Sequence, residues 1–472
     1  MKVILLSCVV IVLLFSGCFR KMDHFNTLKD YSDVFGRLQK VSLKGRKQLS
    51  VSDAGKIAIA NNPTLRAAAN AIRSAQYGYY RSLSAWAPEI SAAGTVAGSK
   101  ARGYDLHHPP AGIFPSEERF DTSVSVKATW LLFNGLAREL DILIADLEYD
   151  KSIAASDDVK RLLLRAVAYI WCDILLASEE IVIFRADKAF QDAALKQAAQ
   201  QFKSGHVAYS AVLNFKILSA SAQSRIILAE YNRQTALNTL AALLGCGSGE
   251  LPADMELLPI SQAPVELYHS PDFYLELAIR NRPDLKVEKL LYEKAIRKKQ
   301  SAYAAFMPEL HLFADFSFGS AAAVYGGYPV KSSYYNHPAF VYGLTGTWNV
   351  FRGLDSLNEL RRQKALEQIA LWGLNKKYLD VIAEVEDALE NCRNTQAQID
   401  IFREMTGWVL EQRELIYSEY INGRETIARV NQAQSALVEA RSNLALWKIQ
   451  YHKAAAQLQA ALGTDAAEWL KL

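Results

Sequence analysis

The sequence predicts a mainly α-helical protein that also contributes strands to a membrane β-barrel. Three observations lead to this fold class. The chain is internally duplicated, each half contains very long proline-free helical stretches, and each half contains two strand-like runs of alternating polarity. The chain has 472 residues, with 53 basic and 50 acidic side chains. It is therefore long enough for several domains, and it carries no basic excess that would favour nucleic acid.

The duplication is visible as short motifs that recur 218 or 220 residues apart. The recurring pairs are AIANNPTL (58–65) with AIRNRPDL (278–285), WAPEI (86–90) with FMPEL (306–310), TWLLFNGL (129–136) with TWNVFRGL (347–354), and QFKSG (201–205) with EYING (419–423). Two repeats of this size indicate pseudo-symmetry rather than a solenoid, which has shorter periods. We place the first repeat at 50–245, a linker at 246–271, the second repeat at 272–465 and a C-terminal tail at 466–472.

The N-terminal sequence MKVILLSCVVIVLLFSGC is typical of a secretory signal peptide, because a charged start precedes a short apolar run and small residues. Residues 15–18 resemble a bacterial lipobox, in which the signal is cut before a cysteine that carries a diacylglycerol. We therefore expect a signal peptide at 1–17 and a lipidated N-terminal segment at 18–49 that begins with acylated Cys18. The alternative is ordinary cleavage nearby, with Cys18 incidental. The Phe at position 19, where Asp would retain a lipoprotein in the inner membrane, indicates the outer membrane.

Proline placement predicts the helices. None of the 13 prolines lies in the four stretches 136–203, 206–244, 354–421 and 424–462. The longer stretch of each half would form a helix of about 100 Å, followed by a glycine turn and a return helix. Helices this long and only moderately apolar must bury their apolar stripes against neighbours along their whole length, as in a coiled coil.

Four runs between the helices alternate between apolar and polar residues: about 89–100, 120–133, 309–319 and 340–351. Each is long enough to cross a bilayer when tilted, which takes about 9–11 residues. Strands in lipid must pair all their backbone groups, so only a closed barrel can span the membrane, and about eight strands are needed to close one. Four strands per chain are too few, so more than one chain must share a barrel with lipid outside and a wet lumen inside.

Two tryptophans, Trp130 and Trp348, lie near the end of a strand run and shortly before a glycine in each half. Aromatic side chains are enriched where a membrane meets water, so we expect these two to lie at the membrane interface. The alternative for each tryptophan alone is ordinary core packing.

The repeated motifs together resemble the TolC-type outer membrane efflux proteins, as a lipoprotein member. The motifs are Asn-Pro or Arg-Pro-Asp-Leu at a helix start, Pro-Glu-hydrophobic before a strand, Trp-x-x-Phe-x-Gly after one, and an aromatic-x-x-Gly turn. The resemblance covers roughly residues 50 to 465. It implies a homotrimer with a 12-stranded barrel and an α-helical tunnel, 246–271 being the linker of the equatorial region. It also implies a periplasmic adaptor (membrane fusion) protein, an inner-membrane RND or ABC transporter, and no cofactor beyond the acyl chains on Cys18.

The turns at Gly205 and Gly423 would form the periplasmic tip and gate of such a channel. The family usually carries an acidic residue six positions beyond the glycine, whereas this chain has Arg429 there and Gln432 at a further position that is acidic in some members. We therefore expect a mixed or basic constriction, in which Arg429 is paired with Glu425. The alternative is solvated surface charge.

Two other classes of protein fit the sequence less well. An enzyme would need a phosphate loop, a nucleophile with its base, or metal-spaced ligands, and none is present; the acidic residues at 384–387 and His107-His108 fit solvated surface. A structural or adhesive lipoprotein with a helical rod remains the alternative function, although a rod has no use for four amphipathic strands. The cysteines show neither zinc spacing nor a disulfide framework.

Overall fold

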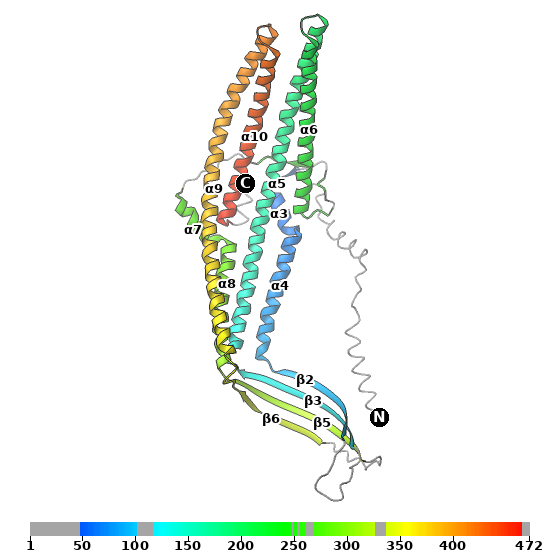
Figure 1. The fold of residues 1–472 in the computed structure, drawn as a ribbon, viewed down its shortest axis with the longest axis vertical. Coiled ribbons are helices and arrows are strands. Elements are labelled where there is room, and N and C mark those ends of the chain that lie inside the picture. The colour runs from blue at the N-terminus through cyan, green and yellow to red at the C-terminus, as the bar shows by residue number, and fades with distance from the viewer. Residues whose placement is uncertain are drawn as a thin grey trace. The chain divides into compact units, whose positions relative to one another are not determined.

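The computed structural model describes residues 48–101, 117–247, 249–252, 255–260, 269–325 and 337–464. The predicted signal peptide, Cys18, His107-His108 and the tail at 466–472 lie outside these residues. The chain forms two compact units (Figure 1). Unit 1 contains 1–66, 159–281 and 383–472, and unit 2 contains 67–158 and 282–382. Each unit thus combines segments of both sequence repeats.

A four-stranded antiparallel sheet dominates unit 2 (Figure 1). Its strands are β2 (Glu89–Ala101), β3 (Glu117–Phe133), β5 (Glu309–Tyr325) and β6 (His337–Thr347), in the spatial order β2-β3-β5-β6. The sheet confirms the four predicted strands, with different ends. The prediction that the last strand reaches residue 351 is wrong: Thr347 pairs with Glu309, the first residue of β5, and Pro308 before it has no N–H to continue the ladder.

The helices of unit 2 either lead into these strands or follow from them. They comprise most of α4 (Pro63–Leu83), α8 (Pro283–Ser301) and the short 3-10 turns η1 (Ser84–Trp86) and η2 (Ala302–Phe306), together with the first parts of α5 (Ala137–Lys203) and α9 (Asp355–Ile421). Helix α8 begins with a proline at its first turn, where the missing N–H costs nothing. Within this first turn the Asp284 carboxylate accepts a hydrogen bond of 2.9 Å from the Leu285 backbone N–H.

The same turn leads from strand to long helix in both repeats. Gly135 and Leu136 have φ values of 68° and 67°, and Gly353 and Leu354 have φ values of 61° and 70°. A positive φ costs a side chain such as leucine of the order of 1–2 kcal/mol. The two repeats therefore keep one strained turn, which redirects the chain from the sheet into a helix.

Unit 1 contains two helical hairpins (Figure 1). The later part of α5 pairs with α6 (Tyr209–Leu243) around Gly205, and the later part of α9 pairs with α10 (Ile427–Leu462) around Gly423. Both glycines have a positive φ, 77° and 73°, which is the usual reason for glycine after a helix. The long and return helices therefore follow the prediction, except that each return helix begins three residues later.

Small apolar side chains make up much of the core of unit 1. Trp171 and Leu240 are fully buried at one end, beside α3 (Val51–Asn61). Helix α7 (Pro271–Asn281) and the two-residue parallel pair β1 (Gln48–Leu49) and β4 (Glu256–Leu257) complete the unit. Alanines line the buried side of α10, which allows close approach of neighbouring helices. No helix in the described ranges has the length and hydropathy needed to cross a bilayer.

Candidate channel surfaces

One face of the sheet in unit 2 is apolar across all four strands and is exposed. The ladder places Ala92, Val126, Phe316 and Phe340 side by side in one row. The exposed apolar side chains of this face are Ile90, Val96, Val124, Val126, Leu312, Phe316, Phe318, Phe340, Tyr342 and Leu344. A contiguous exposed apolar surface of this kind marks contact with membrane or protein.

The opposite face is mostly polar. Ser125 pairs with Ser317, and Lys127 is directly opposite Asp315, so opposite charges face each other across the β3–β5 ladder. Phe313 and exposed Val341 are exceptions, and Phe313 lies over Gly343, where an added Cβ would be 3.3 Å from the ring. The sheet therefore separates an apolar side from a wet side.

The two outer strands, β2 and β6, each have one neighbour in the described part of the sheet. Their other edges present unpaired backbone groups, which cannot remain unpaired in lipid. The sheet is therefore incomplete as a membrane-spanning structure and requires further strands.

The predicted interfacial tryptophans make equivalent contacts in the two repeats. The Trp130 indole N–H donates to the Trp86 carbonyl at 2.9 Å, and the Trp348 indole N–H donates to the Phe306 carbonyl at 3.2 Å. The exposed fractions of the two tryptophans are 41% and 61%. Each indole thus fastens the helix-to-strand junction while its ring remains accessible, and placement at a membrane interface stays a prediction.

One junction has an additional contact that the sequence did not reveal. The Arg138 guanidinium carbon lies 3.4 Å from the centroid of the Trp86 ring, and Nη1 donates to the Leu131 carbonyl at 2.7 Å. The second repeat has Ser356 at the equivalent position, so this contact belongs to the first repeat alone.

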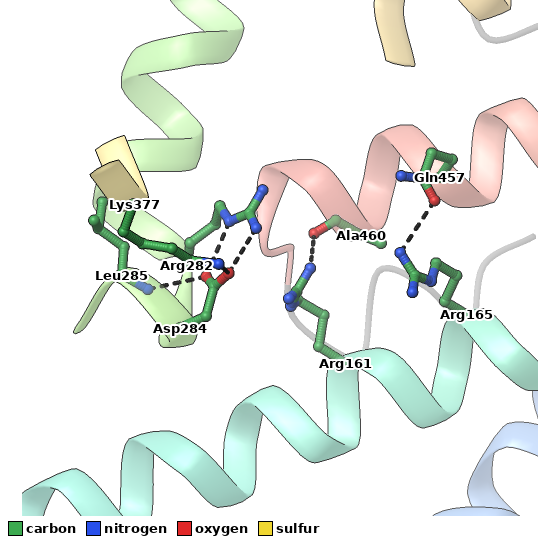
Figure 2. A network of polar contacts seen from close by, with 8 residues as sticks. All are labelled: Arg161, Arg165, Arg282, Asp284, Leu285, Lys377, Gln457 and Ala460. Carbon is green, nitrogen blue, oxygen red and sulfur yellow. Dashed lines mark hydrogen bonds and ion pairs between the residues drawn. The ribbon is translucent and has the colours of Figure 1, made fainter. Parts of the chain in front are cut away.

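Polar contacts join α5 to α10 within unit 1. In Figure 2, Arg161 Nη1 donates to the Ala460 carbonyl at 2.7 Å, and Arg165 Nη1 donates to Gln457 Oε1 at 3.2 Å. Farther along, Lys453 Nζ donates to Asp173 at 2.5 Å. These contacts place α5 beside α10 within unit 1, and α6 and α9 are called the outer helices. Near the tips α9 also reaches α5, where the Tyr417 hydroxyl donates to Gln197 Oε1 at 3.2 Å.

A buried carboxylate continues this seam. Asp187 accepts hydrogen bonds from Gln434 Nε2 at 2.9 Å and from Gln191 Nε2 at 3.2 Å, and all three side chains are buried. No sequence pattern indicates this cluster, because its partners are separated by up to 247 residues. A second polar cluster in Figure 2 belongs to unit 2: the Asp284 carboxylate accepts a hydrogen bond from buried Arg282 and forms an ion pair with Lys377 at 2.7 Å.

The predicted tip residues all lie at or beside the hairpin turns. Gly205, Gly423, Arg429 and Gln432 are exposed, and Glu425 is half-buried. The expected pairing of Arg429 with Glu425 is absent from the described residues. Glu425 instead accepts a hydrogen bond from the Thr426 backbone N–H at 3.1 Å, because at the start of α10 free N–H groups are the nearest donors.

Within the described residues, no group of three or more His, Cys, Asp or Glu side chains could hold a metal ion. A two-sided sheet with open edges, continued by paired long helices, instead defines a class of membrane channel subunits. The model of the family described as "Outer membrane efflux protein" matches residues 55–246 and 274–464. The chain belongs to this family, and it is an outer membrane efflux channel of the trimeric TolC type, as the sequence motifs predicted.

Solved structures agree with this fold. CusC matches with a TM-score of 0.75 and 18% identity, covering 88% of this chain and 92% of that one. VceC of Vibrio cholerae matches at 0.71 and 17%, covering 88% and 96%, and CmeC of Campylobacter jejuni at 0.72 and 14%, covering 89% and 88%. No curated protein shows significant similarity to the chain. Family membership favours the channel over the alternative of a helical rod.

Proposed function

We propose that three copies of this chain close edge to edge into one passive duct across the outer membrane. The carrying observation is the sheet: its apolar face is exposed and both its outer edges are unpaired among the described strands. Pairing β6 of each copy with β2 of the next would satisfy both edges and complete a barrel of twelve strands. The apolar face would then meet lipid, and the face with Lys127 and Asp315 would line the lumen.

The same closure fits the hairpins of unit 1. Since α5 and α10 face each other within the chain, a ring of copies would bring α9 of one copy against α6 of the next. Both outer helices expose large apolar side chains, including Ile217 and Tyr231 on α6 and Ile401 and Trp408 on α9. Burial of such side chains is the usual driving force for association.

We further propose that the duct receives its substrate from an inner-membrane RND or ABC transporter through a periplasmic adaptor protein, and that Cys18 is lipidated. In this role the chain performs no catalytic step and uses no cofactor. At the tip, exposed Arg429 supports a mixed or basic mouth rather than an acidic one. Trp130 and Trp348 would mark the membrane interface.

Cysteine cross-linking tests the proposed closure. Val96 on β2 is replaced by cysteine together with one of several positions along β6, from Phe340 to Leu344, because the register between copies is not fixed by one chain. Non-reducing gels should then show a covalent ladder that ends at a trimer for one pairing. Paired cysteines on the two central strands, β3 and β5, serve as the control and should give no ladder. A ladder that stops at a dimer, or none for any pairing, would overturn the proposal.

A further inference from the structure

Two polar ties between α5 and α10 in unit 1 bracket a cavity of about 290 Å³. One tie is Asp173–Lys453 and the other is Asp187–Gln434. Apolar side chains form most of the wall: Leu175, Ile183, Pro259, Ile260, Leu444, Ala445 and Ile449. The volume is near the lower end of ligand pockets in proteins, which hold about 300–1,000 Å³.

The polar part of the wall is mainly cationic. Arg441 and Lys448 both line the cavity, together with His452, and the only carboxylate of the described lining is Glu179, which is exposed. Neither Arg441 nor Lys448 has an ion pair or hydrogen bond within the described residues, although both are half-buried. Burial lowers the pKa of His452, so its ring is a neutral hydrogen-bonding group beside the two cations.

A smaller cavity of about 120 Å³ shares Arg441 and Ile183 with the first and adds Arg413. The Nε of Arg413 is buried and has no hydrogen-bond partner in the described part of the chain. The carboxylate of this second cavity, Asp187, already accepts hydrogen bonds from two glutamine amides. The described linings of the two cavities therefore hold three cationic side chains and two carboxylates, of which Glu179 is exposed and Asp187 is already hydrogen-bonded.

The duplicated sequence argues against a purely architectural role for these cations. The positions equivalent to Arg441 and Lys448 in the first repeat are Gln223 and Glu230. Glu230 forms an ion pair with Arg185 at 2.8 Å, so the first repeat satisfies its charge internally. The second repeat instead keeps two positive charges that form no ion pair within the described residues, beside a largely apolar cavity whose carboxylate, Glu179, is exposed.

We propose that this cavity binds a small amphiphilic organic anion. Partly desolvated cations are costly unless an opposite charge pairs with them, and the apolar wall favours a ligand with an apolar body. Arg441 and Lys448 are seven residues apart, about 10 Å along the helix, so both long side chains can reach one anionic group between them. The apolar body would lie against Leu175, Ile183 and Ile449, and the ligand would bridge α5 and α10.

A fluorinated aromatic carboxylate, 4-(trifluoromethyl)benzoate, is the probe for the test. Fluorine NMR titration of the full-length oligomer in amphipol measures its affinity beside that of the neutral amide analogue, and the binding of acetate is measured by its competition with the benzoate. The benzoate should bind saturably and the other two should not. Equal binding of the amide would show that charge is irrelevant, and equal binding of acetate would show that the apolar wall is irrelevant. Either result, or no saturable binding of the benzoate, would overturn the proposal.

Variants then place the site. The Arg441→Gln, Lys448→Gln double variant should weaken binding about tenfold or more, because two charge-assisted contacts are lost. The matched control, Lys203→Gln with Arg424→Gln, removes the same charge from exposed positions near the tips and should bind like the parent protein. Arg441→Lys keeps the charge and should retain most of the affinity. Equal affinity in the double variant and its control, with both oligomers intact, would assign the binding elsewhere.

Discussion

Replacing Gly135 by alanine should destabilise the protein far more than the same change at Gly353. Both glycines occupy the strained turn between a strand and a long helix, with φ values of 68° and 61°. An added Cβ at Gly135 would lie 2.8 Å from the Met307 Cβ and 2.9 Å from the Ala304 Cα, whereas at Gly353 it would meet nothing within 4 Å. The two sites thus share the backbone cost and differ only in crowding.

The expected loss of stability in each variant follows from the cost of the positive φ and the cost of crowding. A non-glycine residue in the left-handed region costs about 1–2 kcal/mol, which is the whole effect expected for Gly353→Ala. Overpacking adds about 1–3 kcal/mol, because the backbone Cα of Ala304 cannot move aside as the end of a flexible side chain could. Gly135→Ala should therefore cost about 2–5 kcal/mol in free energy of unfolding.

Oligomeric membrane proteins often unfold irreversibly, so the assay is the apparent midpoint of thermal unfolding at one fixed scan rate. Tryptophan fluorescence of the purified oligomer gives this midpoint for the parent and both variants. Gly135→Ala should have the lowest midpoint and the lowest yield of folded oligomer. Equal midpoints for the two variants, or a lower one for Gly353→Ala, would refute the reasoning from crowding.

Three further predictions concern unit 1. Asp187→Ala leaves the Gln434 amide buried without its acceptor and should lower the free energy of unfolding by about 1–3 kcal/mol. An unchanged midpoint of thermal unfolding would contradict this prediction. Burial raises the pKa of Cys172 to about 12, so this thiol stays protonated at pH 8. It should therefore react with maleimide far more slowly than half-buried Cys246. Peptide mass spectrometry measures the two rates, and equal rates would contradict this prediction. Arg429→Asp should increase cation preference and block by divalent cations in planar bilayers, and no change in either would refute a basic mouth.

Local sequence patterns predicted the strands better at their starts than at their ends. The start of β5 at Glu309 follows from Pro308, which stops the preceding helix. Its end at Tyr325 lies beyond the predicted residue 319, because the small residues that follow carry no alternation and are held by pairing with β3. Pairing also sets the early end of β6, because its partner β5 begins at Glu309. The sequence of one strand alone does not indicate how long its partner is.

Contacts between distant segments were outside the reach of sequence patterns. The hydrogen bond from Gln434 to Asp187 joins residues 247 positions apart. The apolar pattern of α10 is explained by its buried alanines and does not point to this bond. Arg429 shows the opposite case: its spacing from Glu425 suits an ion pair, but the half-turn before α10 directs the carboxylate to the Thr426 N–H. The local geometry at the start of α10 therefore determines the partner of Glu425, which sequence spacing alone does not predict.

Electron cryo-microscopy of the purified oligomer in a lipid nanodisc tests the central claim most directly. We expect threefold density with one closed barrel, in which β6 of each copy pairs with β2 of the next and the face carrying Phe316 and Phe340 meets lipid. Open sheets, a symmetry other than threefold, or a barrel whose lumen is lined by the Phe316 face would contradict it.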